Sequence, residues 1–396
     1  MRGLLMAVAM VLTMGVLSAQ DVESVAVEGQ TIEYKYTPID QTSRAQTGIE
    51  GFGLRLNNYL AMSDADMRRV KLSAIGGPAY STNTGWRLAA SATMHYRTKG
   101  CSSPHSLVLS GMASLRGCFS LALEGKNYLG SEHHMLTYGG GMSQMSAYLY
   151  GLDYATSASG MFGEYTSRDC HAFVHYHYRA TKALTVGATA DYDYEEVRAM
   201  DGYVGQMLEG RDDSFSGLGL GLNATFSTRR TEGVNLTRGV YARAEYVVHP
   251  DMFTSCGNTL HEVNLTFDYY QPLWRGGFVV VDLYGEHHSA DTPWLMRANM
   301  GGDSRMRGYY YGRYGGNTMA TAQVELRQRV WEGLVVAGWG GCGAAFGVHD
   351  PVSWQRVLPT YGAGIRWYIN PTMAVRIDYG FGRDCSALIV GYSEAF

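Results

Sequence analysis

Apolar and polar residues alternate along most of the chain from residue 71 onward. The pattern is clearest where Leu218, Leu220 and Leu222 are separated by Gly219 and Gly221. Because successive side chains of a strand point to opposite faces, a period of two predicts strands with one apolar face. Sixteen such segments can be counted: 71–80, 85–97, 105–115, 118–128, 134–146, 170–181, 184–197, 216–228, 238–249, 260–273, 276–287, 319–330, 333–345, 360–369, 372–382 and 385–396.

The connections between these segments distinguish a membrane barrel from a soluble sheet, which alternates in the same way. Three connections are short, at 180–183, Trp274-Arg275 and Asn370-Pro371. The long ones are 147–169, 198–215, 250–259, 288–318 and 346–359. Bacterial transmembrane barrels have an even number of strands, short periplasmic turns and long outer loops, and they close because lipid offers no hydrogen-bond partners. We therefore predict an all-β, transmembrane antiparallel β-barrel of about 16 strands over residues 71–396.

Aromatic residues at the segment ends agree with a barrel, because Tyr and Trp gather at the two membrane interfaces. They include Tyr192, Tyr194, Tyr269, Tyr270, Trp274, Trp331 and Trp367. A soluble β-solenoid is the competing architecture, but the chain has no repeat of fixed period.

The first seventy residues do not alternate. Arg2 precedes an apolar run from Leu4 to Leu17 that ends in Ser18-Ala19, which is the pattern of a secretory signal peptide over residues 1–19. Residues 20–70 are predicted to form a short N-terminal periplasmic segment, with one capped helix after Ser63.

Composition narrows the function classes. The net charge of −4 argues against nucleic-acid binding, for which a basic patch would be expected. Six cysteines lie far apart and lack metal-ligand spacing, so disulfides and unpaired thiols both remain open; they are Cys101, Cys118, Cys170, Cys256, Cys342 and Cys385. His171, His175 and His177 share one strand face, but His171 and His175 are too far apart along it to hold one metal ion. No metal or other cofactor is predicted.

The stretch from Met300 to Tyr314 is glycine-rich, aromatic and basic, and fits neither helix nor strand. It contains a glycine pair followed by Arg307-Gly308-Tyr309. After it comes the alternating strand Ala322-Gln323-Val324-Glu325-Leu326-Arg327, and the sequence ends at Phe396. Over residues 276–396 this order resembles the BamA/TamA-type bacterial surface antigen superfamily, whose members are outer-membrane barrels for protein assembly and translocation.

The resemblance implies that loop 288–318 folds back into the lumen as a lid. Its motif residues would be Gly301, Gly302, Arg307, Gly308 and Tyr309. A buried guanidinium needs a carboxylate partner, and Glu325 lies on the polar face of the next strand, as do Thr321, Gln323 and Arg327. The family often adds an Asp on the following strand in an aromatic-x-Asp pattern, but after Trp339 this chain has Gly341 there. The alternative is an exposed, solvated loop.

The resemblance further implies a place in the outer membrane of a Gram-negative bacterium and a role in inserting or organising proteins or lipids there. Lipopolysaccharide and phospholipid would surround the barrel, and Phe396 would be the C-terminal sorting signal read by the barrel-assembly machinery. About fifty residues before the barrel are too few for a POTRA domain, so a POTRA-less short form is expected.

Two alternatives to this role stay open. One is a passive or loop-gated pore with a polar lumen lined by Glu262, Asp268, Arg366, Arg376 and Asp378. The other is a structural barrel that acts with a partner or a second copy. An enzyme is not predicted, because Gly302-Asp303-Ser304-Arg305-Met306 lacks the closing glycine of a nucleophile elbow.

Overall fold

The computed structural model describes residues 70–81, 85–96, 105–231, 237–331, 333–348, 350, 353–370, 373–391 and 394–395. The predicted signal peptide, the segment before residue 70, Cys101 and Phe396 lie outside these residues. The five described cysteines form no disulfide with one another.

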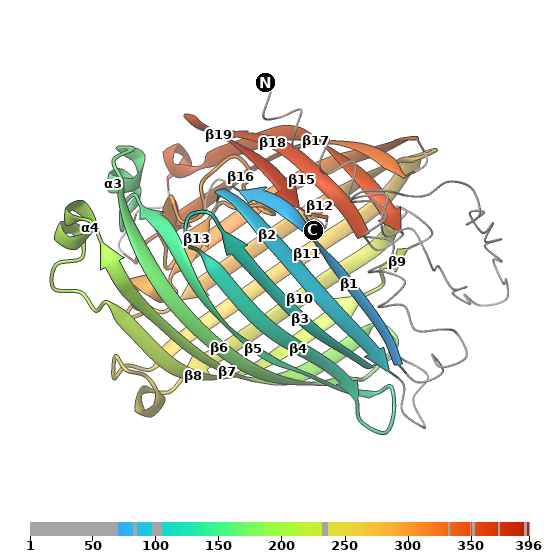
Figure 1. The fold of residues 1–396 in the computed structure, drawn as a ribbon, viewed down its shortest axis with the longest axis horizontal. Coiled ribbons are helices and arrows are strands. Elements are labelled where there is room, and N and C mark those ends of the chain that lie inside the picture. The colour runs from blue at the N-terminus through green and yellow to red at the C-terminus, as the bar shows by residue number, and fades with distance from the viewer. Residues whose placement is uncertain are drawn as a thin grey trace, which may run out of the picture.

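The described chain is a closed antiparallel barrel of sixteen strands, as the alternation predicts. The barrel strands are β1 (Val70–Ser81), β2 (Gly85–Tyr96), β3 (His105–Ser114), β4 (Phe119–Tyr128), β5 (His134–Leu149), β6 (Gly163–Arg179), β7 (Leu184–Met200), β8 (Ser214–Ser227), β10 (Thr237–His249), β11 (Leu260–Trp274), β12 (Gly277–His288), β15 (Thr318–Trp331), β16 (Leu334–Phe346), β17 (Leu358–Asn370), β18 (Met373–Gly382) and β19 (Cys385–Gly391). Each pairs with the next along the chain, and β19 returns to β1 (Figure 1).

The remaining elements are short and lie in the connections. They are α3 (Tyr154–Ala158), α4 (Gly202–Met207), β9 (Arg230–Thr231), η2 (Asp251–Phe253), η3 (Trp294–Met296), β13 (Ala298–Met300), β14 (Tyr314–Gly316) and η4 (Trp354–Arg356). The helices α3 and α4 mark the end of the barrel that carries the long loops, on the left of Figure 1. None of the helices in the described part of the chain is long and apolar enough to cross a membrane.

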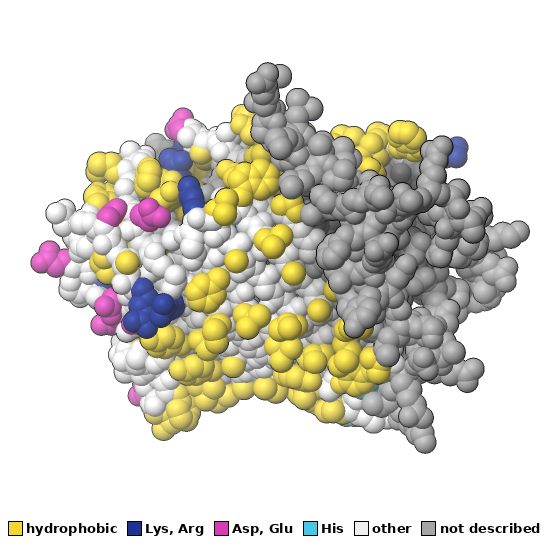
Figure 2. Space-filling model, in the orientation of Figure 1, with side chains coloured by type: hydrophobic (Ala, Val, Ile, Leu, Met, Phe, Trp, Pro, Cys, Tyr) yellow, Lys and Arg dark blue, Asp and Glu magenta, His cyan; other side chains and the backbone are white. Residues whose placement is uncertain are grey.

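The outer wall is apolar and the lumen wall is polar, the reverse of a soluble protein. On β15, the outward-facing Val324 and Leu326 are 48% and 42% exposed. The alternating residues Gln323 and Glu325 face the lumen and are 1% and 0% exposed. Figure 2 shows apolar side chains spread over the outer wall, with charged ones gathered toward the long-loop end. This is the arrangement that hydrocarbon around the barrel and water inside it require.

Most strand boundaries lie within three residues of the sequence prediction, and two differ by more. Strand β6 begins at Gly163 rather than at residue 170, so part of the predicted loop 147–169 is strand. The first residues of β6 include the exposed Glu164 and Arg168. Outside the apolar band of the barrel the outward face need not be apolar, so the alternation of apolar and polar residues is lost there. The last strand ends at Gly391, and Glu394 is not in a strand but ion-paired inside the barrel.

Candidate functional site: a loop anchored in the lumen

The connection between β12 and β15, residues 289–317, is folded into the barrel, and we call it the lumen loop. Its two short strands β13 and β14 pair as a hairpin from Ala298↔Gly316 to Met300↔Tyr314. Met306 and Tyr309 are fully buried and belong to an apolar cluster shared with Leu358 of the barrel wall. The loop is therefore packed against the wall, which excludes the alternative of an exposed, solvated segment.

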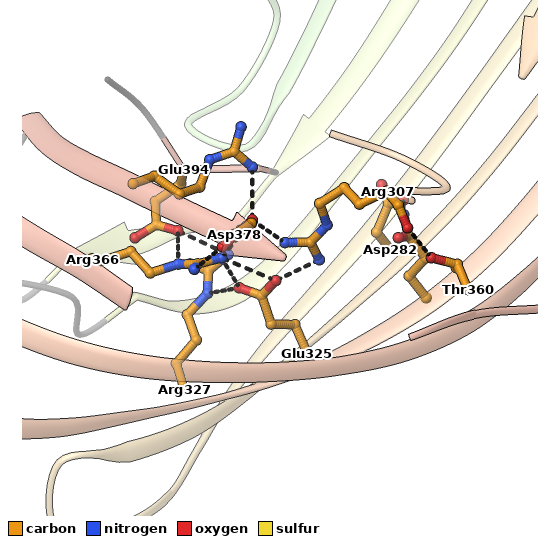
Figure 3. Close-up of polar contacts among 10 residues, drawn as sticks. Asp282, Arg307, Glu325, Arg327, Thr360, Arg366, Asp378 and Glu394 are labelled. Atoms are coloured by element: carbon orange, nitrogen blue, oxygen red, sulfur yellow. Dashed lines mark hydrogen bonds and ion pairs between the residues drawn. The ribbon is translucent and has the colours of Figure 1, made fainter. Parts of the chain in front are cut away.

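Arg307 is the centre of the contact between the lumen loop and the wall. Its side chain is fully buried, and its Nη2 donates to Glu325 Oε2 of β15 at 2.6 Å. Its Nη1 donates to Asp378 Oδ2 of β18 at 2.8 Å (Figure 3). The guanidinium also lies 3.7 Å from the ring centroid of Trp339 on β16. One loop side chain thus joins three wall strands by charge-assisted hydrogen bonds and a cation–π contact.

Three wall arginines complete the ion-pair cluster around the two carboxylates. Arg327 contacts Glu325 at 2.5 Å, and Arg376 contacts Asp378 at 3.4 Å. Arg366 pairs with both, lying 3.3 Å from Glu325. Four guanidinium groups therefore converge on these two acids and on Glu394, which Arg327 contacts at 3.3 Å and Arg366 at 3.4 Å (Figure 3). Arg307 is the one member of this cluster that the loop supplies.

Backbone packing at Gly308 explains how Arg307 comes so close to β18. Gly308 has a φ of +113°, and a Cβ there would lie 2.7 Å from the backbone carbon of Phe381. A Cβ on the facing Gly380 would lie 2.7 Å from the carbonyl of Arg307. Two glycines are needed because the two backbones touch directly. Thr360 Oγ1 donates to the Arg307 carbonyl at 2.6 Å and fixes the same point.

Arg305 and Tyr309 provide two further attachments. The Arg305 guanidinium binds the buried Asp282 of β12 in bidentate fashion, with contacts of 2.8–3.1 Å. The Tyr309 hydroxyl donates to the carbonyl of Pro359 at 2.7 Å and accepts from the backbone N–H of Arg383 at 2.7 Å. The loop is thus attached to β12 on one side and to β17 and the turn after β18 on the other.

Of the residues singled out by sequence, Arg307 and Glu325 are ion-paired in the cluster, and Gly308 and Tyr309 lie beside it in contact with the wall. Gly301 and Gly302 both have positive φ, and Gly302 N–H donates to the carbonyl of Tyr309 at 3.3 Å. They therefore close the segment that presents Arg307 rather than contacting Glu325.

Asp378 supplies the second carboxylate that the sequence comparison expected at position 341. A Cβ at Gly341 would lie 2.4 Å from the Ala322 carbonyl oxygen and 2.7 Å from Gln323 Cγ. The lumen face of β16 has no room for a side chain at that point, so the acid comes from β18 instead. The signal available in sequence was the polar face of segment 372–382, which includes Arg376 and Asp378.

Comparison with known proteins identifies the fold but no close relative. No family model and no curated protein sequence matches the chain. Among solved structures, BamA from Haemophilus ducreyi lacking POTRA domains 1–3 matches with a TM-score of 0.59 at 13% identity, over 81% of this chain and 70% of that one. CdiB from Escherichia coli matches with a TM-score of 0.55 at 11% identity, over 84% and 64%. CdiB from Acinetobacter baumannii gives 0.53 at 12% identity, over 82% and 60%.

Fold and site together define a β-barrel protein of the Gram-negative outer membrane with a loop anchored in its lumen. More narrowly, the barrel has the fold shared by the BamA that lacks POTRA domains 1–3 and by the two CdiB barrels. The chain spans less than two thirds of the length of either CdiB structure.

Proposed function

We propose that the protein assists the insertion, translocation or organisation of proteins or lipids at the outer membrane, using the β1–β19 seam as a template. The observation that carries the proposal is the short pairing at this seam. Strand β1 pairs with β2 along its whole length, from Val70↔Tyr96 to Ser81↔Gly85. Between the described residues of β1 and β19, the register is the single pair Tyr80↔Val390.

Most of the edge of β1 that faces the seam lies beyond the described end of β19. Since Tyr80 is opposite Val390, Ala79 is opposite Gly391, where β19 ends. At this register Gly76 would face Glu394, which is instead ion-paired to Arg327 and Arg366 in the lumen, so β1 from Val70 to Gly76 has no described partner on β19. A strand edge offers a row of N–H and C=O groups to which an incoming strand can add. In lipid such pairing is strongly favoured because no water competes for these groups.

The lumen loop supports this mechanism by holding one side of the seam in place. Arg307 connects β15 with β18, the neighbour of β19. Glu394, three residues after β19, is held by Arg327, by Arg366 and by the Tyr368 hydroxyl. The last strand, β19, is therefore held on two sides, because Arg307 fixes its neighbour β18 and the wall residues fix Glu394 beyond its end. In this mechanism β1 separates from β19. This mechanism needs no catalytic residue and no cofactor.

The test is a reversible lock across the seam. With the native cysteines replaced by serine, a Tyr80→Cys/Val390→Cys pair is introduced, because residues directly opposite in an antiparallel pair have suitable Cβ spacing for a disulfide. The purified protein is expected to accelerate insertion of an unfolded outer-membrane barrel into liposomes when reduced. When oxidised, it is expected to lose that acceleration and to recover it on reduction.

The matched control is an Ala92→Cys/Leu109→Cys pair, which joins β2 and β3 within a long continuous register. Oxidation of this pair is expected to leave the acceleration unchanged. If the locked seam works as well as the reduced one, or if the protein never accelerates insertion, the proposed role is wrong.

Other parts of the proposal concern partners and delivery. Lipopolysaccharide and phospholipid would contact the apolar outer wall, and the barrel-assembly machinery would handle this chain as a client. Phe396 would act as its sorting signal, so its deletion is expected to lower the amount of protein in the outer membrane.

A further inference from the structure

The lumen wall has two parts that differ in charge and in the solvent exposure of their side chains. Under the lumen loop, the carboxylates of Asp282, Glu325 and Asp378 are 0% exposed and each contacts arginine. Across the barrel, carboxylates of β6, β7 and β11 also face the lumen but remain partly exposed. Side-chain exposure is 37% for Asp169, 24% for Asp191, 36% for Asp193 and 23% for Glu262. We call this second region the acidic wall.

Charged and imidazole side chains follow one another along the acidic wall. On β6, Asp169, His171 and His175 are spaced by multiples of two, and therefore share the lumen face. The strand register puts Asp169 opposite Glu195 and His171 opposite Asp193 on β7. His175 Nε2 lies 2.6 Å from Asp191 Oδ1. The series runs from near the long-loop end of β6 toward its short-turn end.

Several buried polar groups beside this series make no hydrogen bond within the described part of the protein. His249 is 3% exposed, and its Nε2 has no hydrogen-bond partner but faces Asp193 Oδ2 across 4.0 Å. That gap is too wide for a direct hydrogen bond, and water or a small cation could bridge it. Thr189 Oγ1 and both amide atoms of Asn223 are likewise buried without a hydrogen bond. Buried polar atoms are nearly always satisfied, so these groups point to an occupant between the walls.

A cavity of about 420 Å³ continues the series toward the long-loop end. It lies between the lumen loop and strands β5–β7, with Asp169 and Glu195 on the wall side and Asp303 on the loop side. Arg87 and Arg297 also line it, so carboxylates outnumber guanidinium groups by three to two. The cavity therefore joins the acidic wall to space beside the loop, without passing through the arginine cluster that anchors it.

We propose that small monovalent cations cross the barrel along the acidic wall while the lumen loop remains anchored. Carboxylates that face a lumen with low-dielectric walls concentrate cations and repel anions, which is how acidic rings give channels cation selectivity. The four arginines under the lumen loop are ion-paired with three carboxylates, Glu325, Asp378 and Glu394, so most of the positive charge that would oppose this preference is compensated. This activity is separate from the proposed seam mechanism, because the carboxylates of the acidic wall lie on β6, β7 and β11 and not on the seam strands β1 and β19.

The test is ion selectivity of the full chain in a planar lipid bilayer, measured as the reversal potential in a KCl gradient. The unaltered protein is expected to prefer K⁺ over Cl⁻. The double variant Asp191→Asn/Asp193→Asn is expected to lower the K⁺/Cl⁻ permeability ratio at least about twofold. Asp193→Glu, which keeps the charge, is expected to preserve the ratio.

The matched control is Glu209→Gln, which removes one negative charge from an exposed position outside the barrel strands and is expected to leave the ratio unchanged. Folding is checked by heat-modifiable migration on a gel; if the double variant does not fold, Glu262→Gln takes its place with the same expectation. No steady conductance, a preference for Cl⁻, or an unchanged ratio in a folded variant overturns the proposal.

Discussion

Arg307→Met is expected to release the lumen loop from the barrel wall. The variant keeps side-chain bulk but removes both ion pairs and the contact with Trp339. The other three arginines come from the wall, so they cannot replace the attachment of the loop. Removing one partner from a buried ion-pair cluster costs about 3–5 kcal/mol, which here is free energy of loop docking. Rapid proteolysis within residues 289–317 and a lower temperature for the heat-modifiable gel shift are the expected observations.

Arg356→Ala is the matched control for the loss of an arginine ion pair. Arg356 pairs with Asp350 at 2.7 Å in an outer loop, where both side chains remain partly exposed. Pairs of this kind contribute about 0–1 kcal/mol, so proteolysis of the lumen loop should be unaffected. Should Arg307→Met behave like Arg356→Ala in both assays, the ion pairs of Arg307 do not hold the loop.

Gly308→Ala is expected to lift the Arg307 segment away from β18. The substitution combines two costs, a φ of +113° that L-residues rarely adopt and a Cβ only 2.7 Å from the Phe381 backbone. Backbone cannot yield as a flexible side chain does, so we expect a loss of about 3 kcal/mol or more of docking free energy. The measurements are again protease sensitivity of the loop and the temperature of the gel shift.

Substitutions at two other glycines separate the cost of backbone strain from the cost of the steric clash. Gly312 also has a positive φ, +79°, but its nearest neighbour would be 3.7 Å from an added Cβ, so Gly312→Ala tests strain alone at about 1–2 kcal/mol. Gly340 has no atom within 4 Å of such a Cβ, and Gly340→Ala should be neutral. The steric explanation fails if Gly308→Ala is no worse than Gly312→Ala.

The strands could be predicted from sequence because a barrel wall imposes the same two-residue period on every crossing. The prediction was least accurate where that constraint ends. Strand β6 extends beyond the apolar band through Glu164 and Arg168, and nothing in those residues separates strand from polar loop. The inward-folded loop was expected from the family resemblance, whose motif residues, the glycine pair, Arg307-Gly308-Tyr309 and Glu325, are local features of the sequence.

The arginine cluster was only partly predictable, because its contacts depend on how the barrel closes. Arg307 and Asp378 are 71 positions apart, with the three barrel strands β15, β16 and β17 between them in the chain. The absence of space at Gly341 follows from the side chain and backbone of β15, which no local pattern encodes. The acidic wall raises the same difficulty, since Asp193 and His249 approach each other from strands that are not neighbours.

The bridge that Arg307 makes between β15 and β18 has a mechanical consequence. Arg307 ties β15, β16 and β18 together from inside the barrel, so this sector of the wall is expected to be stiffer than the sector formed by β2 to β8. When a barrel with one stiff sector changes its cross-section, the more flexible sector bends. In the seam mechanism proposed above, β19 borders the stiffer sector, so β1 and β2 are the strands expected to move when the seam opens.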